Sequence, residues 1–531
     1  MTDVDSLRQQ LRERGYLTHG IERWFALDPW SSRAFWVELV LVALKAAILI
    51  AAFGALPLTA IMLFRDAPLG AFETLGLFLT YAAAWLILAF AFVIAIALTL
   101  KVRPALPIDT PRALLAISVA AGALLVAPIA VWWYRFDTAP ALPELATGAA
   151  LTVVFFVVVT LVLSAALLSF SMYEVRRIPA IHQKPRTIPM LVAAIALIAL
   201  LFVPAYLERE RPAVQPMVVT SPTATRVALI AVDGLTSEIL RSRPDIVRVF
   251  PHVTAVSTIH GDSTAERWAS LGTGVRTEAH GVRAIEGVRF RGGAHVLQRI
   301  SRADFVLMRL APLLGLARRE PLPPTVRRRD YVWELFAERG VTSVAVNWWT
   351  TADVQAAGLT SIGPESIFTA AHGDALQVDR VAGERFVQNV YKQSPRFATV
   401  YLPALDVILN RLALDPTTRL ANSLKALDGV VPAIRLARAR GYEVVLAGMP
   451  GDGQSGSAVV ASTMPFAGSS AWDVAPSILD AIGFPPSNEM PGSAKSASPR
   501  IATYGPRERD DAEHSVNEEY YQNLKSLGYI R

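Results

Sequence analysis

Apolar residues before Leu207 form five long stretches: 36–64, 71–100, 112–134, 146–172 and 188–206. A helix needs about 20 predominantly apolar residues to cross the hydrocarbon core of a bilayer. Each stretch approaches or exceeds that length, so the pattern predicts about five transmembrane helices. The second stretch has no polar break at its centre, between Thr80 and Leu100. It therefore predicts one tilted span rather than two short helices.

The distribution of basic residues predicts an orientation, because cytoplasmic loops collect Lys and Arg. Basic residues gather in the tail 1–35 and in the segments 101–112 and 176–186, whereas the alternate loops carry only Arg65 and Arg135. An odd number of spans with a cytoplasmic N-terminus places the C-terminal part outside. The tail is charged and the apolar stretch behind it is too long for a cleavable signal. We therefore expect a multi-pass protein of the cell (inner) membrane with an extracytoplasmic C-terminal domain.

After a polar linker, the hydrophobic pattern changes to that of an α/β domain. Short apolar runs alternate with helical spacing, which predicts a mostly parallel central sheet with helices on both faces. The runs lie at 226–232, 341–346, 397–402 and 443–446, and the helical patterns at 331–339 and 418–440. The predicted organisation is a cytoplasmic tail 1–35, a transmembrane domain 36–206, a linker 207–224 and an α/β domain 225–531.

Composition agrees with this division and excludes other classes. Of the 531 residues, 53% are hydrophobic and 18% charged, against about 45–50% and 25% in soluble domains. Lys and Arg exceed Asp and Glu by 17 to 14 before Thr225 and by 34 to 31 from there on, so neither part is a basic nucleic-acid-binding domain. The chain has no cysteine, which excludes disulfides and thiolate metal sites.

Two positions could carry chemistry at the carboxyl ends of the strands, where α/β sheets bind ligands. Asp233 ends a buried run, and the following Gly234 would let its carboxylate approach a cation; the alternative is a helix-capping aspartate. Thr264 begins a helical pattern, where the positive helix end favours an alkoxide and a bound phosphate. The alternative for Thr264 is a simple N-cap.

Several motifs together resemble the alkaline phosphatase superfamily. They are Asp233-Gly234, the run Thr264 to Gly274 with its Trp268 and Ser270, His280-Gly281, the segment 332–348, the helix 473–483 and the tail 523–529. Their order and spacing are similar to those of the type I phosphodiesterase/nucleotide pyrophosphatase group, which neighbours the sulfatases. The resemblance covers about 225–531. Several spans before such a domain also resemble lipid-headgroup phosphotransferases.

The resemblance implies two metal ions, usually zinc, beside a nucleophilic Thr or Ser that forms a covalent phospho-enzyme. Asp233 would correspond to a metal ligand and Thr264 to the nucleophile. Asp406 and Asn410 correspond to the family's Asp-x-x-x-His pattern, with Asn410 in place of histidine. Asp452 corresponds to the aspartate of the Asp-His-Gly motif if a short insertion precedes it; without one, Gly448 and Met449 take those places.

The chain departs from the family at every histidine ligand, and 454–465 contains no histidine. His260 is a candidate substitute ligand, and we expect His280 to be structural. Glu266 would repel a bound phosphate unless a cation or Arg267, a possible phosphate contact, offsets it. The arginines at 318–319 and 327–329 are expected to form a solvated face rather than an anion site.

Three functions remain open at this level. The favoured one is a catalytically degenerate domain with a binding or scaffolding role. The second is an active phosphodiesterase or lipid-headgroup phosphotransferase that uses Thr264 and an all-oxygen site, which would suit Mg²⁺, Mn²⁺ or Ca²⁺ better than Zn²⁺. The third is transport through the membrane domain, where Lys45 and Glu73 are the ionisable candidates. The expected partners are the membrane and a phosphate ester or lipid headgroup, not a nucleic acid.

Overall fold

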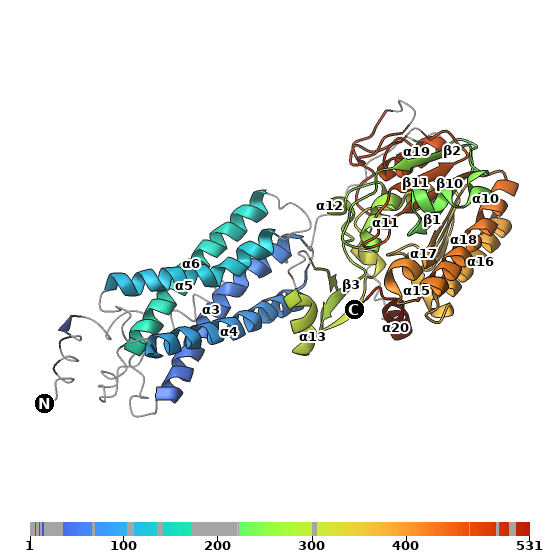
Figure 1. Ribbon diagram of the computed structural model, residues 1–531. Helices are drawn as coiled ribbons and strands as arrows, with labels where there is room; N and C mark the ends of the chain where they lie inside the picture. Colours follow the sequence, from blue (N-terminus) through green and yellow to red (C-terminus); the bar gives the residue numbers. More distant parts are fainter. Residues whose placement is uncertain are drawn as a thin grey trace. The chain divides into compact units, whose positions relative to one another are not determined.

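The structure is a computed structural model of the whole chain, shown in Figure 1. It describes Ser6, Gln10, Glu13, Arg14 and the residues 35–65, 69–102, 111–134, 142–171, 220, 222–299, 305–466, 468–494, 499–508 and 517–530.

The chain divides into two compact units. The first contains Met1–Arg211 together with Val288–Arg319, and the second contains Pro212–Gly287 and Glu320–Arg531. The sequence pattern predicted one continuous domain from 225 onward, so the grouping of Val288–Arg319 with the N-terminal helices is a departure. We call this segment the excursion. Its apolar side chains join the helical core, which a pattern confined to neighbouring residues does not reveal.

Four long helices coincide with four of the five predicted apolar stretches: α3 (Phe35–Arg65), α4 (Ala71–Val102), α5 (Pro111–Tyr134) and α6 (Leu142–Ser171). Within the described residues, three carry apolar segments long enough to cross a membrane: Leu39–Leu63, Ala71–Thr99 and Leu145–Leu168. The apolar part of α5, Leu114–Ile129, is shorter. The fifth stretch, 188–206, lies outside the described residues, so a count of five stays a prediction. The second stretch forms one continuous helix, as predicted.

Two hydrophobic clusters hold the first unit together. In one, α3, α4, α5 and α6 pack through residues such as Trp85, whose ring meets Phe155 edge-on with centroids 5.0 Å apart. In the other, buried residues of the excursion pack against α3 and α4. Glu73 at the start of α4 accepts hydrogen bonds from the backbone N–H groups of Ala294 and His295 at 2.8 and 3.1 Å. The excursion is thus joined to the helices by polar as well as apolar contacts.

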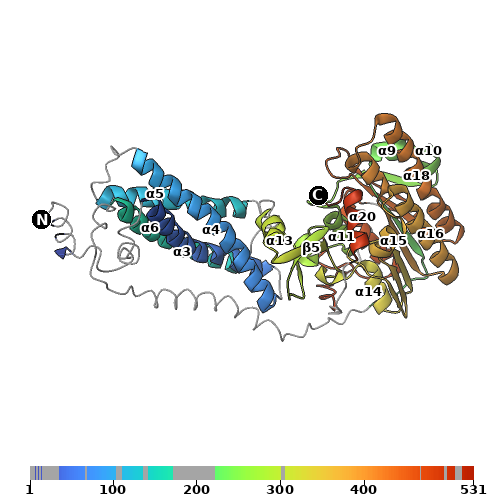
Figure 2. The ribbon, with the colours of Figure 1, turned by 90° about the horizontal axis from the view of Figure 1, so that it is seen from below.

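The second unit is built on an eight-stranded sheet with the order β2-β11-β10-β1-β9-β6-β8-β7. The central run from β10 to β8 is parallel, whereas β11, β2 and β7 pair antiparallel at the two edges. Helices α16 and α18 lie side by side on the sheet (Figure 2), α16 against β6 and β9 and α18 against β1 and β10. Helix α14 contacts β6, β8 and β9, and α19 contacts β1. The mostly parallel α/β fold predicted from the sequence is confirmed.

The strands of this sheet are β1 (Val227–Asp233), β2 (His252–Val256), β6 (Ser343–Val346), β7 (Val354–Ala356), β8 (Leu359–Ile362), β9 (Phe397–Leu402), β10 (Glu443–Met449) and β11 (Ala458–Ser462). A smaller sheet has the order β4-β3-β5, from Val296–Leu297, Glu286–Phe290 and Ala317–Pro321. The helices are α9 (Ser237–Arg241), α10 (Pro244–Val247), α11 (Thr264–Thr273), α12 (Thr277–His280), α13 (Ala311–Leu313), α14 (Val332–Glu338), α15 (Pro364–Ala370), α16 (Ala375–Gln393), α17 (Ala404–Asp406), α18 (Pro416–Ala439), α19 (Val474–Ile482) and α20 (Glu518–Ser526). Short π or 3₁₀ turns are η3 (Val306–Leu310), η4 (Pro324–Val326), η5 (Val407–Arg411) and η6 (Ala471–Asp473).

The four predicted apolar runs correspond to β1, β6, β9 and β10. Every residue of β1 and β9 is buried, which explains why these runs are continuously apolar rather than alternating. Because β1 is flanked by β9 and β10 in parallel, the carboxyl ends of all three strands lie at one edge. That edge positions the candidate site.

Candidate functional site

Asp233 is the last residue of β1 and its side chain is fully buried. Its Oδ2 accepts a hydrogen bond from the Tyr401 hydroxyl at 2.9 Å. Gly234 adopts a left-handed backbone with φ +79°, and a Cβ there would lie 2.7 Å from the backbone nitrogen of Asp406. The glycine therefore allows the end of β1 to approach Asp406 closely. Asp233 is not a helix cap, since Thr236 caps α9.

Thr264 is the first residue of α11 and is also fully buried. The N-cap is the preceding residue, Ser263, whose hydroxyl accepts from the backbone N–H of Glu266 at 3.1 Å. The interpretation of Thr264 as an N-cap is therefore wrong. Its hydroxyl oxygen instead accepts hydrogen bonds from two guanidinium groups, at 2.8 Å from Arg411 and at 3.1 Å from Arg267.

Asp406 meets Asn410 and Arg411 through a π-helical turn, η5, that follows α17. In such a turn, residues five apart are brought to the same side. Arg411 Nε lies 2.7 Å from Asp406 Oδ2, and Asn410 Nδ2 donates to Oδ1 at 2.8 Å. Both oxygens of this fully buried carboxylate therefore have a partner from its own turn.

Asp452 lies on the loop after β10 and joins the two arginines. Its Oδ1 is 2.8 Å from Arg267 Nη1, and its Oδ2 is 2.8 Å from Arg411 Nη2. The Asp452 side chain is 40% exposed, whereas those of Arg267 and Arg411 are 9% and 8% exposed. Asp452 is thus the solvent-facing member of the cluster. Gln454, on the same loop, accepts from the Gly451 N–H and donates to the Gly234 carbonyl.

The cluster balances buried negative charge with buried positive charge. Burial, together with the nearby charge of Asp406, raises the pKa of Asp233 to about 7, although Arg267 and Arg411 act in the opposite direction. Burial thus disfavours the charged form of Asp233. We call the carboxyl groups of Asp233, Asp406 and Asp452 together with the guanidinium groups of Arg267 and Arg411 the arginine–carboxylate cluster.

The residues at this edge do not fit the two-metal site that the resemblance implies. Asp406 already uses Oδ2 for Arg411 and Oδ1 for Asn410, and a side chain on Gly451 would collide with that Oδ1. The loop backbone therefore fills the space beside the carboxylate. Over the part of the chain that the structure describes, no three His, Cys, Asp or Glu side chains are grouped to hold a metal ion. Here the guanidinium of Arg411 contacts the groups that a metal ion would contact in the family pattern.

If the family's Asp-His-Gly motif is aligned without an insertion, Gly448 and Met449 take the places of its Asp and His. These two residues lie within β10, where Met449 pairs with Asp233 and Gly448 pairs with Val232. Both are buried, and a Cβ on Gly448 would collide with the carbonyl oxygen of Leu235. Asp452, the counterpart with an insertion, contacts both arginines.

The carboxylate of Glu266, two residues after Thr264, has hydrogen-bond partners within the domain. This carboxylate accepts hydrogen bonds from the Asp262 N–H and the Thr277 hydroxyl, both at 2.7 Å. It fixes the start of α11 and the following α12. Glu266 therefore has a structural role at this helix start.

The histidines near α11 do not replace the missing ligands. His280 is fully buried, its Nδ1 accepts from the Val282 N–H at 3.1 Å, and its Nε2 lies 2.9 Å from the Ser270 hydroxyl. Burial lowers the pKa of His280 to about 3, so the ring is neutral and structural, as expected. His260 is exposed at the surface.

Arg327 was expected on a solvated face, and this is wrong. It is fully buried, forms hydrogen bonds of 2.6 and 2.7 Å with Glu334, and lies 4.0 Å from the centre of the Tyr331 ring. Arg329 pairs with Glu489 at 2.8 Å. Both arginines belong to the structural framework rather than to an anion site.

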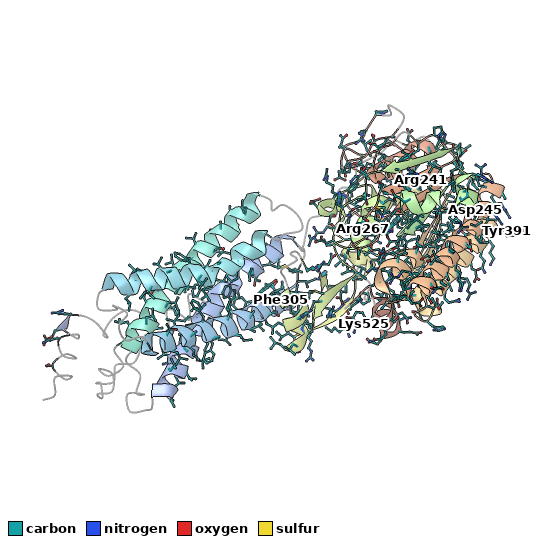
Figure 3. All side chains as sticks on the ribbon, in the orientation of Figure 1. Arg241, Asp245, Arg267, Phe305, Tyr391 and Lys525 are labelled. Atoms are coloured by element: carbon teal, nitrogen blue, oxygen red, sulfur yellow. The ribbon has the colours of Figure 1, made fainter. Side chains whose placement is uncertain are left out.

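Arg411 was missed by reasoning from the sequence. It directly follows Asn410, the position where the family's histidine is absent, and that adjacency was the available signal. A residue five positions after Asp406 points elsewhere in a regular α-helix, so the π-helical turn was needed to bring it into the cluster. Arg267, by contrast, was identified beside Thr264 and is labelled in Figure 3.

Residues 227–447 match the family model "Type I phosphodiesterase / nucleotide pyrophosphatase". No curated protein matches the chain.

Similar solved structures include phosphonoacetate hydrolase from Sinorhizobium meliloti 1021 with phosphonoformate, at 12% identity and a TM-score of 0.30. The match covers 44% of this chain and 59% of that one. Murine ectonucleotide pyrophosphatase/phosphodiesterase 5, an inactive variant with AMP, is 13% identical with a TM-score of 0.29, over 42% and 56% of the two chains. The human protein of that name is 16% identical with a TM-score of 0.28 over the same shares. The chain thus spans less than two thirds of the solved structures that it matches.

Residues 227–447 are thus similar to the type I phosphodiesterase/nucleotide pyrophosphatase family, and the described residues before them include three helices long and apolar enough to cross a membrane.

Proposed function

We propose that this protein is a membrane-anchored, phosphodiesterase-like protein that binds an anionic ligand and does not perform metal-dependent hydrolysis. The observation that carries this proposal is the position of Arg411. Its guanidinium contacts Thr264, Asp406 and Asp452, the residues that the family resemblance assigns to the nucleophile and the metal ligands.

Charge supports a binding role. A divalent ion would have to enter beside the buried guanidinium of Arg411, which is always charged, and would have to compete for the same carboxylate oxygens. Removing a partner from a buried ion pair costs roughly 3–5 kcal/mol, so this exchange is unfavourable. Binding of a metal ion by the arginine–carboxylate cluster is therefore unfavourable. Replacement of its one exposed carboxylate by an anionic ligand would leave the buried ion pairs in place.

The exposed anion is Asp452, and its place suggests the ligand class. The Asp452 carboxylate binds one nitrogen from each of two guanidinium groups, beside the N-terminus of α11. Arginine pairs and helix N-termini are common phosphate-binding elements. A phosphate ester or a lipid headgroup phosphate could replace the Asp452 carboxylate and contact the Thr264 hydroxyl as well.

The orientation in the membrane is part of the proposal. The contact of Glu73 with Ala294 and His295 supports a common side of the membrane for the start of α4 and the excursion. The chain from the start of α4 to the excursion then crosses the membrane an even number of times. If only α4 and α6 span the membrane in this part of the chain, the number of crossings is two. If α5 also spans it, a fourth crossing is required, and the segment 188–206 could supply it. In either case α3 puts the N-terminus on the opposite side from the α/β unit, in agreement with the loop charges.

Metal content and turnover of the purified full-length protein test the binding role. We expect no stoichiometric zinc, and no hydrolysis of an aryl phosphodiester with Zn²⁺, Mg²⁺, Mn²⁺ or Ca²⁺ above that of a Thr264→Ala control. Turnover that requires both Thr264 and one of these ions would refute the proposal and favour an all-oxygen catalytic site.

A cytoplasm-specific reporter fused after Arg531 tests the orientation. It should be inactive, because we propose that the α/β domain is extracytoplasmic. Strong activity would overturn the orientation, and a second reporter at the N-terminus provides the positive control.

A further inference from the structure

The surface of the excursion carries apolar side chains that its own packing leaves uncovered. Leu313 in α13 is 82% exposed, the largest value among the large hydrophobic residues of the described part of the chain. Phe305, labelled in Figure 3, is 68% exposed, and Leu314 is 45% exposed. Three such residues lie within ten positions of one another; in the α/β unit, exposed large apolar residues include Tyr391 and the pair Leu420 and Leu424 on α18.

The other side of the same segment is anchored to the helices. Leu307 in η3 and Ala311 in α13 are fully buried in the cluster that also contains Leu77 and Phe78 of α4. The segment from 305 to 314 therefore has one apolar side against α4 and an outward side that exposes Phe305, Leu313 and Leu314 together with Arg309. Large apolar side chains on the outward side of a helical segment that is already apolar on its inner side are not typical of a protein surface in water.

The helix that this segment packs against, α4, is a candidate membrane span with an exposed apolar surface of its own. Phe72 and Leu75 at the start of α4 are 63% and 42% exposed, and Ile87 farther along is 61% exposed. In the most apolar 18-residue stretch of α4, only 22% of the residues are buried within the protein. Most of the surface of this stretch therefore requires an apolar environment. Figures 1 and 2 both show α13 beside α4, and the clusters above place η3 and α13 against it.

Basic residues lie between and after the exposed apolar side chains of this segment. Arg309 and Arg318 are exposed and lie before and after Leu313 and Leu314. In segments that lie in a membrane interface, apolar side chains enter the acyl region while basic ones remain at the phosphate level.

We propose that the segment 305–314 inserts its exposed side into the bilayer, as a second membrane contact beside α4. The occupant of this surface is lipid, with acyl chains against Phe305, Leu313 and Leu314 and anionic headgroups near the two arginines. The proposal rests on α4 crossing the membrane and not on the function of the arginine–carboxylate cluster.

The absence of cysteine from the chain allows a direct test with single spin labels. Leu313→Cys would be labelled in the full-length protein, reconstituted in vesicles of phosphatidylcholine and phosphatidylglycerol. Collision with oxygen, which concentrates in the bilayer, is compared with collision with a polar nickel chelate. Ile87→Cys in α4 is the lipid reference. Tyr391→Cys, 63% exposed on α16, is the water reference.

The label at Leu313 should resemble the one at Ile87, with an oxygen-to-nickel collision ratio severalfold above that at Tyr391. A ratio equal to that at Tyr391 would overturn the proposal. Protection from both reagents would overturn it too, because it would mean that protein covers the surface. Phe305→Cys repeats the measurement at a second position, and an unchanged unfolding temperature confirms that each labelled protein is folded.

Discussion

Arg411 Nη2 lies 2.8 Å from the hydroxyl oxygen of Thr264, although the two residues are 147 positions apart in the sequence. The same nitrogen is 2.8 Å from Asp452, and Nε of the same side chain is 2.7 Å from Asp406. One guanidinium group therefore connects the end of β9, the start of α11 and the loop after β10. This relationship gives the domain a fixed internal cation.

Removing that cation should strongly destabilise the protein. Arg411→Ala leaves the fully buried Asp406 without its charged partner, which costs roughly 3–5 kcal/mol. For a unit of this size, the unfolding midpoint should fall by about 5–15 °C. Tryptophan fluorescence during heating measures this. Arg380→Ala is the matched control, because its pair with Glu384 is exposed and should contribute less than about 1 kcal/mol. An Arg411→Ala midpoint equal to that of the control would contradict the importance of the cluster.

Removing the exposed anion should open a phosphate site. Asp452→Ala leaves the guanidinium groups of Arg267 and Arg411 with less negative charge around them. Inorganic phosphate should then raise the unfolding midpoint more for this variant than for the unchanged protein, at equal ionic strength. At a concentration 100 times the Kd, the added stability would be about 2.7 kcal/mol. Asp245→Ala, in an exposed pair with Arg243, serves as the control. An equal response of all three proteins would argue against an anion site.

His280 should make the protein sensitive to acid. Its pKa is about 3 in the folded protein, against an ordinary value of about 6.5 in the unfolded chain. Below pH 6.5 the unfolded chain therefore binds a proton that the folded protein does not bind. Stability present above pH 6.5 should be lost towards pH 3, by at most about 1.4 kcal/mol per pH unit from this residue.

The measurement compares unfolding free energy at pH 7 and pH 5 for the unchanged protein and for His280→Gln. The variant should be less stable at pH 7 but should lose less stability on acidification. His260→Gln, which alters an exposed histidine, should follow the unchanged protein. Identical pH dependence in all three would exclude His280 as the acid-sensitive group.

Glu73 should protect the excursion from local opening. Glu73→Ala removes the charged acceptor for the part-buried backbone N–H groups of Ala294 and His295, and hydrogen bonds to a charged group contribute up to about 1–3 kcal/mol. Hydrogen exchange of the segment 288–299 should become faster by roughly 5- to 100-fold if it occurs by local opening. Exchange in β1, which lies in the other unit, should not change. Acceleration in both places would indicate global destabilisation instead.

The sequence by itself determined the kinds of elements and the class of the domain. The apolar stretch 71–100 predicted one long helix because its length and continuity are local properties, and α4 has this form. The run 397–402 predicted a strand for the same reason, and β9 has those bounds. The order of motifs from Asp233 to Gly483 indicated a resemblance to the type I phosphodiesterase/nucleotide pyrophosphatase family, whose model matches residues 227–447.

Only the tertiary structure decided what the candidate site contains. Thr264, Asp406 and Asp452 could be aligned with a metal site residue by residue, but the cation between them comes from Arg411, which the π-helical turn brings to that place. The partners of Glu73 lie more than 200 residues away, in a segment whose pattern resembles the rest of the α/β domain. Contacts of this kind form between residues that are far apart in the sequence and come together only when the chain folds. The hydrophobic periodicity of a segment shows which of its residues are buried, but it does not show which charged group a buried residue contacts.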